Sequence, residues 1–546
     1  MMRFIRQLKE DAYRRLLAET ARRAGVREIA IALIALALGA SATYSQLGPA
    51  GFLLLEGLDE FSFTGRALAF GDFNGDGIDD LAIGLPGLLV LPGGPEAGGV
   101  LVQLGTTGGV TLSMLLTASD LEDGEEQFQA GFGSSLAVGD FDADGRDDLA
   151  VGIPGYAING EDGAGAFGVF YGRDGLSFLG DGELRSQAGL VGLPEESDWF
   201  GSSLAAGDLS GDGVDDLAIG VIGENLLVGV AQVSNAGAVN VVYGTEGVGL
   251  TSIGNQLLHH QVANVDGTAG QDDQFGFALA IGEFTGDGFQ DLAVGIPGMG
   301  DFLVGGEDGF GGLRIFRGGD GGIDLSSSEP VWFQGSTGIL GNPTDNDAFG
   351  TALAVGDFNG DRVTDLAVGV PGEDEFGPDH SGAVQILYGR QDIGLDDLGD
   401  QFFSESLFDG DVDEDDRFGE ALAAGDFDLS GHDDLAIGAP RDDSLGVENA
   451  GEVSVLYGTD SGLSVAGAQL ANMLFFDSLD PGDRFGQALA VGRHNGDHGP
   501  DLAIGAPSRE VDGDILVGAV VVLFSRTLFV DGFETGDTSG WSATEP

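Results

Sequence analysis

Six short stretches of the sequence place oxygen-bearing side chains at alternating positions, an arrangement that can hold a metal ion. The first stretch, DFNGDGIDD, begins at Asp72 and has Asn74, Asp76 and Asp80 at its third, fifth and ninth positions. The seventh residue, Ile78, could add its backbone carbonyl. Calcium takes about six to eight oxygen ligands, and alternate residues of a tight loop can direct theirs to one point. The glycine at position six allows the positive φ that such a turn needs. These loops therefore predict structural calcium sites.

The other five loops repeat this pattern with different ligand sets. In each of them, as in the first, the seventh residue is a candidate through its carbonyl oxygen. Their candidate ligands are Asp140, Asp142, Asp144, Arg146 and Asp148; Asp208, Ser210, Asp212, Val214 and Asp216; Glu283, Thr285, Asp287, Phe289 and Asp291; Asp357, Asn359, Asp361, Val363 and Asp365; and Asp426, Asp428, Ser430, His432 and Asp434.

The loops differ in quality. Loops 1, 2, 3 and 5 have the strongest sets, although loop 5 has Arg362 where glycine belongs, a backbone strain of about 1 kcal/mol. Loops 4 and 6 are weaker, and we expect calcium there as well. A seventh copy begins with Arg493 and carries His498 at position six. A cation in the first ligand position argues against metal binding in loop 7.

The loops have two other possible interpretations. An EF-hand ends with a bidentate glutamate at position 12 and is flanked by helices, whereas position 12 here is Ile83, Val151, Ile219 or Val294, within strand-like runs. The aspartates could also serve only as turn-forming hydrogen-bond acceptors. Bunched carboxylates without a cation repel one another, so the repeated pattern favours metal-bearing hairpin turns.

The loops belong to a longer repeat that determines the expected fold. The phrase F-G-x-x-L-A-x-G-D recurs at Phe132, Phe200, Phe275, Phe349, Phe418 and Phe485, with a weaker first copy at Thr64. Each copy is followed by DLA[IV]G, read as a buried inner strand, and usually by a strand such as GVFYG. Seven copies of four short strands fill residues 50–525 and leave no room for a separate catalytic domain.

Four antiparallel strands per repeat predict an all-β fold, a seven-bladed β-propeller of four-stranded antiparallel blades. The last repeat supplies three strands, and residues 50–57 stand where a fourth strand would precede the first repeat. We therefore expect the N-terminal strand to pair with the last blade and close the ring. A linear solenoid is the alternative, but it would need capping repeats.

The segment FGSSLAVGDFDADGRDDLAVGIPG resembles the FG-GAP repeat, the blade unit of the propeller at the head of integrin α chains and of many bacterial exported proteins. The resemblance covers nearly all of residues 50–525. It implies calcium loops on one face of the disc and, by comparison with integrins, ligand binding on the other. The inserted domain of some integrin α chains and the leg domains have no counterpart here, so the resemblance implies a propeller head alone.

Composition limits the partners and the location. The chain has 22 Lys and Arg against 90 Asp and Glu, a net charge of −68, which excludes nucleic acid and anionic membranes as partners and favours divalent cations. High-salt adaptation is a second reading of this acidity.

Residues 1–42 combine a basic segment, a short apolar run and an A-x-A site, so they predict a signal peptide and no membrane span in the mature chain, with an uncleaved anchor as the alternative. Cysteine is absent, so no disulfide stabilises the exported chain.

We divide the chain into the signal peptide (1–42), the propeller (43–526) and a C-terminal tail (527–546). The face opposite the calcium loops carries long loops at 154–166, 223–238, 297–312 and 371–383, and an aspartate two residues before five of the repeat phenylalanines: Asp198, Asp273, Asp347, Asp416 and Asp483. Variable loops on a rigid scaffold are typical binding sites.

We expect a secreted or cell-surface binding or adhesion module for an extracellular protein or polysaccharide ligand, and no enzyme. The six histidines form no H-E-x-x-H pattern, and there is no cysteine nucleophile and no G-x-S-x-G turn. A structural surface protein is a further reading. Carboxylate pairs are abundant, so a calcium-dependent carbohydrate-active hydrolase or lyase remains the alternative.

Overall fold

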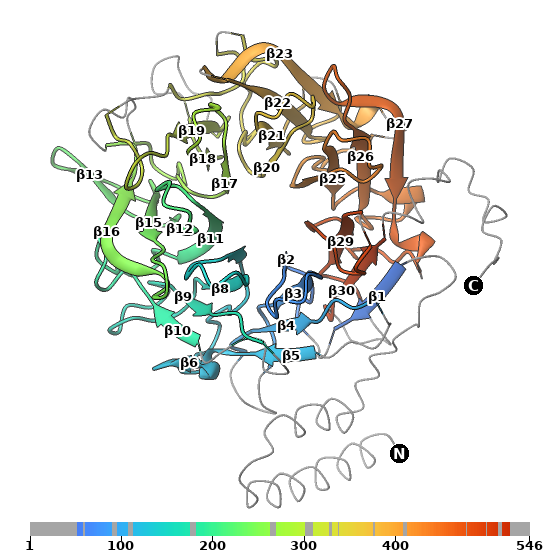
Figure 1. Cartoon of the computed structure of the whole chain (residues 1–546). Helices are drawn as coiled ribbons and strands as arrows, with labels where there is room; N and C mark the ends of the chain where they lie inside the picture. The colour runs from blue at the N-terminus through green and yellow to red at the C-terminus, as the bar shows by residue number, and fades with distance from the viewer. Residues whose placement is uncertain are drawn as a thin grey trace, which may run out of the picture.

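The protein folds as a ring of seven β-sheets around a central axis (Figure 1). This computed structural model describes residues 52–524, except for 58–60, 90–95, 108–112, 175–178, 180–181, 262–268, 301–308, 327–329, 337, 375–376, 392, 408–411, 477, 498 and 511–515. The predicted signal peptide, the C-terminal tail and His498 lie outside the described residues. No helix in the described part of the chain is long and apolar enough to cross a membrane.

Each blade is an antiparallel meander, and the first strands of neighbouring blades contact one another around the axis. Blade 1 contains β2 (Leu68–Gly71), β3 (Asp80–Leu85), β4 (Gly99–Gln103) and β5 (Ser113–Leu116). Blade 2 contains β7 (Leu136–Gly139), β8 (Asp148–Ile153), β9 (Ala166–Phe170) and β10 (Gly182–Arg185). Blade 3 contains β11 (Phe200–Gly207), β12 (Asp216–Val221), β15 (Ala238–Tyr243) and β16 (Thr251–Leu258).

Blades 4 to 7 repeat this order. Blade 4 contains β17 (Leu279–Gly282), β18 (Asp291–Ile296) and β19 (Gly312–Phe316). Blade 5 contains β20 (Leu353–Gly356), β21 (Asp365–Val370), β22 (Ala383–Arg390) and β23 (Gly394–Ser404). Blade 6 contains β24 (Ala421–Gly425), β25 (Asp434–Ala439), β26 (Glu452–Tyr457) and β27 (Ser464–Ala471). Blade 7 contains β28 (Ala488–Gly492), β29 (Asp501–Ala506), β30 (Ala519–Leu523) and β1 (Phe52–Glu56). The predicted seven-bladed propeller is confirmed.

Some short elements depart from the regular pattern. In blade 4 the described residues of the fourth-strand region form only a bridge, between Leu313 and Trp332. Strand β6 (Leu121–Glu122) pairs in parallel with β10, and β13 (Leu226–Val228) and β14 (Ala231–Val233) form a hairpin within the predicted loop 223–238. Four 3-10 turns complete the described elements: η1 (Ala118–Asp120), η2 (Glu405–Leu407), η3 (Ser444–Gly446) and η4 (Met473–Phe475).

The DLA[IV]G run forms the second strand of each blade, directly after the acidic hairpin turn, as the order of strands in the repeat predicts. All six residues of β8 are buried, and so are all six residues of its counterparts in the other blades. Both sides of this strand lie against neighbouring blades, so a continuous apolar run suits it better than an alternating one. In the first core cluster, Val100 and Val102 of blade 1 lie together with Leu149 and Val151 of blade 2.

The ring closes through the N-terminal strand, as predicted. Strand β1 pairs antiparallel with β30, with Leu54 opposite Val521. Blade 7 therefore takes three strands from the end of the chain and one from its beginning, which Figure 1 shows where β1 lies beside β30. Closure removes the open ends that a linear solenoid would have to cap.

Two recurring glycines hold neighbouring blades close together. Gly295, in the DLAVG of blade 4, faces the carbonyl oxygen of Gly350, in the F-G of blade 5, so closely that a Cβ on Gly295 would overlap that oxygen. The same contact joins Gly505 of blade 7 to Gly65 of blade 1. These glycines recur because a backbone atom occupies the place of a side chain.

We expect Gly295→Ala to destabilise the protein by about 1–3 kcal/mol or more, because the added methyl group must push two blades apart. Gly319→Ala is the matched control in the same blade, since a Cβ there would lie 3.6 Å from its nearest neighbour. Urea unfolding of both variants measures the difference. Equal midpoints for the two variants would contradict this account of the blade contact.

Candidate metal loops and candidate binding face

The first residue of each acidic loop holds the turn together through backbone hydrogen bonds. The Asp140 carboxylate accepts the N–H groups of Asp144 at 3.0 Å and of Gly145 at 2.9 Å. Asp72, Asp208, Glu283, Asp357 and Asp426 do the same in their loops. These hydrogen bonds hold the loop backbone around its first carboxylate. Arg493 cannot accept such bonds in loop 7.

The ninth residue is a buried carboxylate that ties the loop to its blade. Asp148 is 1% exposed and accepts the N–H of Phe141 at 2.9 Å and that of Gly172, just beyond the third strand, at 2.8 Å. Its counterparts in the other loops, Asp80, Asp216, Asp291, Asp365 and Asp434, are fully buried and accept the corresponding glycine N–H. This residue therefore links the first two strands to the third.

Burial disfavours the charge on these ninth-position carboxylates. It is the largest cause that raises the pKa of Asp148 and of Asp365 to about 8, and that of Asp80, Asp216, Asp291 and Asp434 to about 7, with the neighbouring carboxylates adding to the effect. A divalent cation among these groups would reverse the effect by favouring the ionised form. The donor set therefore fits a hard cation.

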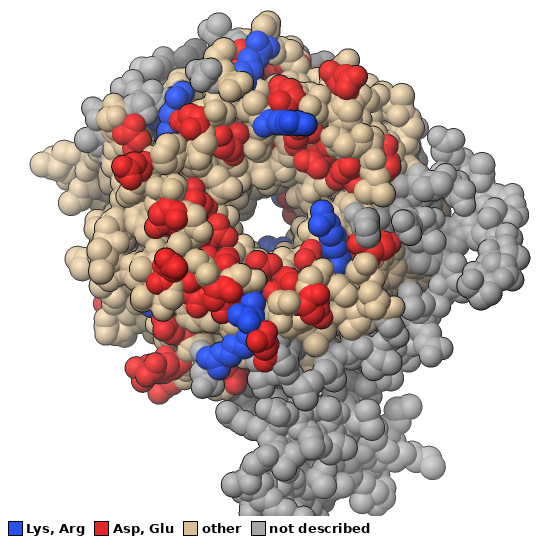
Figure 2. Space-filling view, viewed as in Figure 1, with Lys and Arg blue, Asp and Glu red and all other residues tan. Residues whose placement is uncertain are grey.

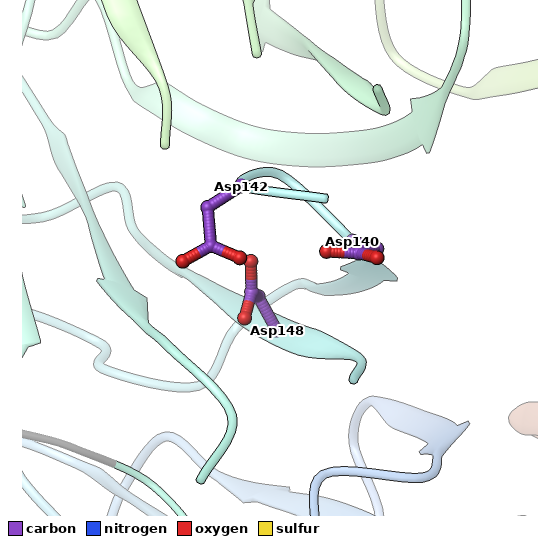
Figure 3. A group of neighbouring side chains, drawn as sticks. All are labelled: Asp140, Asp142 and Asp148. Carbon is purple, nitrogen blue, oxygen red and sulfur yellow. The ribbon is translucent and has the colours of Figure 1, made fainter. Parts of the chain in front are cut away.

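Carboxylate oxygens converge most closely in loops 2 and 6. Oxygens of Asp140, Asp142 and Asp148 lie within 4.8 Å of one another, and Figure 3 shows Asp142 and Asp148 directed toward each other with Asp140 beside them. Asp426, Asp428 and Asp434 form the same group in loop 6, a loop that the sequence ranked below loop 5. Both loops have aspartate at position three, which explains their closer convergence.

The remaining predicted ligands serve the turns in several ways. Asn74 donates its amide to Asp80 at 3.1 Å, so its oxygen reaches a cation only if the amide is flipped. At position five, Asp76, Asp144, Asp212, Asp287 and Asp361 accept the N–H of the seventh residue. Two seventh-position side chains contact acids: Arg146 pairs with Asp174 at 2.8 Å and with Asp144, a predicted ligand of its own loop, at 2.9 Å, and His432 Nε2 lies 3.0 Å from the Asp460 carboxylate.

The structure adds a loop residue that the sequence analysis missed, the one at position eight. The Asp147 carboxylate of blade 2 accepts the N–H of Asp72 in blade 1 at 2.7 Å, and the Asp147 N–H donates to the Asp72 carbonyl at 3.2 Å. The bond from Arg493 to Asp79 repeats this link across the closure of the ring, at 2.7 Å. In the sequence, the two consecutive aspartates at positions eight and nine of loops 1, 2 and 3 could have indicated this contact.

The opposite face buries a polar cluster in each of blades 3 to 7, which we call the blade nodes. Each contains the aspartate two residues before the repeat phenylalanine: Asp198, Asp273, Asp347, Asp416 and Asp483, which are at most 2% exposed. These residues lie on the face opposite the acidic loops, as expected, but their burial closes them to a large ligand. The other side chains of each node come from residues just after the fourth strand of the preceding blade or just after the second strand of the same blade.

Four nodes contain a donor that faces the acids. Gln187 donates to Glu224 at 3.1 Å in blade 3, and Gln334 donates to Glu373 in blade 5. His260 Nε2 lies 3.3 Å from the Asp273 carboxylate in blade 4, and Arg509 Nη1 lies 3.0 Å from that of Asp483 in blade 7.

The blade 3 node predicts a pH dependence of stability. Burial raises the pKa of Asp198 to about 7 from its ordinary value of 3.8. The folded chain therefore holds a proton that the unfolded chain releases between pH 4 and 7, and stability falls as the pH rises through that window. We expect Asp198→Asn to reduce the change in unfolding free energy across this window by about 1–4 kcal/mol, so that its Tm depends less on pH than that of the wild type. Calorimetry from pH 4.5 to 8 would contradict this if the two profiles were parallel.

A cavity of about 1070 Å³ opens on the axis at the face opposite the acidic loops. Its lining includes Pro86, Pro154, Pro297 and Pro371, each directly after a second strand, which fixes the face. We call this cavity the axial mouth. The polar and aromatic side chains that line it include Arg66, Gln129, Trp199, Gln274, Arg417 and Gln487.

Side chains of different kinds reach the axial mouth from equivalent backbone positions. The residue before the repeat phenylalanine has a left-handed φ in each of blades 2 to 7, for example 54° at Trp199, 58° at Ala348 and 59° at Arg417. Repetition shows that this backbone is part of the turn, while the side chain varies from blade to blade. On the face that it draws, Figure 2 shows many acidic and few basic side chains around the opening of the ring. The lining of the axial mouth differs in kind, because it contains Arg66 and Arg417 and one carboxylate, Glu420, among the described residues.

Comparisons with known proteins agree with this architecture. The FG-GAP repeat family matches residues 64–102, 132–170, 200–242, 349–387 and 418–456. Integrin alpha-5 of Xenopus laevis is 32% identical over 247 residues, 44% of this chain and 20% of the integrin. Phosphatidylinositol-glycan-specific phospholipase D of Homo sapiens is 36% identical over 160 residues, 29% of this chain and 18% of the phospholipase. This chain therefore spans about a fifth of the curated relatives that it matches.

Among solved structures, the rhamnogalacturonan lyase YesW aligns with 87% of this chain and 73% of the lyase chain, at 13% identity and a TM-score of 0.37. The five family matches and the integrin alpha relatives support an FG-GAP β-propeller that is similar to those of integrin alpha chains.

Proposed function

We propose that this FG-GAP repeat β-propeller is an exported, calcium-stabilised binding module that takes an extracellular protein or glycan ligand at its axial mouth. The observation that carries the proposal is the mouth itself, about 1070 Å³ in volume and lined by arginine, glutamine and tryptophan side chains from several blades. A concave site with a few convergent polar groups is the usual form of a ligand pocket.

The side chains of the mouth indicate the kind of ligand. Trp199 is 40% exposed and Phe277 38% exposed, so both offer apolar faces for a sugar ring or an aliphatic side chain. Arg66 and Arg417 offer donors to carboxylate or sulfate groups. Arg417 also pairs with Asp415 at 3.0 Å, which orients its guanidinium group. We therefore favour a ligand that combines an anionic group with an apolar face.

Calcium has a supporting role in this proposal. The acidic loops lie at the ends of the second strands opposite the axial mouth, so ions there would stabilise hairpins and blade contacts without touching the ligand. Integrin alpha and phospholipase D relatives support an extracellular setting. The predicted signal peptide is part of the same proposal.

Arrays of extracellular proteins and of acidic glycans test the binding function. We expect the wild-type protein to capture a ligand and the variants Trp199→Ala and Arg417→Ala to lose at least tenfold in affinity. Alanine at these positions suits the backbone, because Ala348 occupies the equivalent place in blade 5 with a φ of 58°. A matched control is Leu193→Ala, at a side chain that is 73% exposed and absent from the mouth lining. A ligand whose affinity survives both mouth variants would contradict the proposal.

An enzyme is the second candidate, because the phospholipase D relatives are enzymes by name. Glu420 lines the axial mouth and lies 3.8 Å from Arg417, so it is the carboxylate that we would assign to acid–base chemistry there. Polysaccharide turnover by the wild-type protein that Glu420→Gln abolishes would replace the binding proposal by a catalytic one.

A further inference from the structure

One blade node lacks the donor that the others contain. In blade 6 the node consists of Glu405, directly after β23, Asp416, two residues before Phe418, and Asp442, three residues after β25. One carboxylate oxygen from each lies within 4.8 Å of the other two. The exposed fractions are 3% for Glu405, 0% for Asp416 and 5% for Asp442. Three acids therefore meet in the protein interior.

The other nodes provide an internal comparison. The place of Glu405, just past the fourth strand of the preceding blade, belongs to Gln187 in blade 3, His260 in blade 4 and Gln334 in blade 5. Each of those side chains faces an acid of its node. Blade 7 balances Asp483 with Arg509 instead. Blade 6 has an acid at the position where blades 3, 4 and 5 have a side chain able to donate.

Two oxygens of the blade 6 node have no donor while the carboxylates are ionised, and a proton shared between Glu405 and Asp416 is the hydrogen bond open to them. They are Glu405 Oε2 and Asp416 Oδ1, and both belong to side chains that are at least nine-tenths buried. The other oxygen of Asp416 accepts the N–H of Asp413 at 2.6 Å. The nearby arginines, Arg417 and Arg441, pair with Asp415, at 3.0 and 2.6 Å. Buried charges need a partner, and for this node a cation or a shared proton can provide it.

We propose that the Glu405–Asp416–Asp442 node binds one hard divalent cation such as calcium, at a site separate from the acidic loops and on the opposite face of the disc. Three carboxylates offer up to six oxygen ligands, and carboxylate oxygens are the hard ligands that such an ion prefers. The ion would take the place of the donors in blades 3 to 5, and would fasten η2, the lead-in to Phe418 and the turn after β25 to one point.

The shared proton is the competing explanation. Burial, and then the charges of Asp416 and Asp442, raise the pKa of Glu405 strongly. A node that contains only protons would leave the metal content of the protein unaffected by a neutral residue at position 405. The two explanations therefore differ in the number of ions that the folded chain binds.

Metal counting on the full secreted chain, equilibrated with Ca²⁺ and measured by inductively coupled plasma mass spectrometry, tests the proposal. We expect Glu405→Gln, which introduces the residue of blades 3 and 5, to bind one calcium ion fewer per chain than the wild type. Glu224→Gln in the blade 3 node, where Gln187 donates to the Glu224 carboxylate, is the matched control and should leave the count unchanged. Equal counts for Glu405→Gln and the wild type would overturn the proposal.

A second measurement does not depend on the folding of a variant. Wild-type crystals equilibrated with Mn²⁺ should give an anomalous difference peak among the three carboxylates of the node. Peaks at the acidic loops with none at the node would overturn the proposal. The acidic loops serve as an internal positive control in the same crystal, and failure of ligand binding at the axial mouth would leave this result unchanged.

Discussion

Chelation of divalent cations with EDTA is expected to lower the Tm of the propeller by about 10 °C. An ion present at a hundredfold excess over its Kd stabilises the folded state by about 2.7 kcal/mol per site. Four occupied loops would add about 10 kcal/mol, and a chain of this size gains about 1 °C for each kcal/mol. The effect is large because the calcium loops join the first strand to the second strand in blades 1 to 6, and the chain has no cysteine to form a disulfide.

Thermal melts in EDTA and in excess calcium measure this difference, and two variants show where it arises. Asp140→Asn removes a first ligand from loop 2 and should reduce the calcium-induced shift by roughly a quarter. Asp497→Asn, in loop 7 where Arg493 occupies the first position, should leave the shift unchanged. Superimposable melts of the wild type in the two buffers would contradict a structural role for calcium.

Removal of the N-terminal strand is expected to prevent folding of the monomeric ring at 37 °C. A chain that starts at residue 58 lacks β1, so β30 loses its ladder from Phe52 to Glu56 and becomes an open edge. Leu54 is 7% exposed and packs in the core cluster that contains Val521 and Phe485. The loss of four apolar side chains and five paired residues would cost on the order of 5–10 kcal/mol, comparable with the stability of a typical domain.

Circular dichroism and size-exclusion chromatography of the truncated chain measure this effect. A synthetic peptide of residues 48–57 should restore the monomeric fold, because an added strand can pair with an exposed edge. Leu54→Ala is the milder companion variant and should lower the stability by about 2–4 kcal/mol while the ring remains closed. A monomeric truncated chain with the Tm of the wild type would show that β1 does not close the ring.

The sequence predicts the fold well because the evidence for it is repetitive and local. Seven copies of a four-strand unit, with three strands in the last copy and a spare strand before the first, are enough to predict a closed ring, and β1 pairs with β30 accordingly. The order of strands in a blade was accessible as well, because the DLA[IV]G run follows the acidic hairpin turn and so had to be the second strand. Its burial between two neighbouring blades accounts for the continuous apolar run.

The candidate sites were predictable only where they lie within one loop. Asp140, Asp142 and Asp148 converge because they belong to a single turn. The link from Asp147 to Asp72 joins two blades, and the node of Glu405, Asp416 and Asp442 joins three segments. Spacing along the chain carries no direct signal for such contacts, although the doubled aspartates and the repeated lead-in aspartates marked the positions.

The central claim is that the acidic loops bind calcium and that the ligand binds on the other face. Anomalous diffraction from wild-type crystals grown in calcium is the most direct test. The account predicts calcium peaks in loops 1, 2, 3 and 5, and in loops 4 and 6, none in loop 7 beside Arg493, and none among the Trp199 and Arg417 side chains of the axial mouth. Loops without calcium in crystals of a stable, folded ring, or calcium in the mouth, would contradict it.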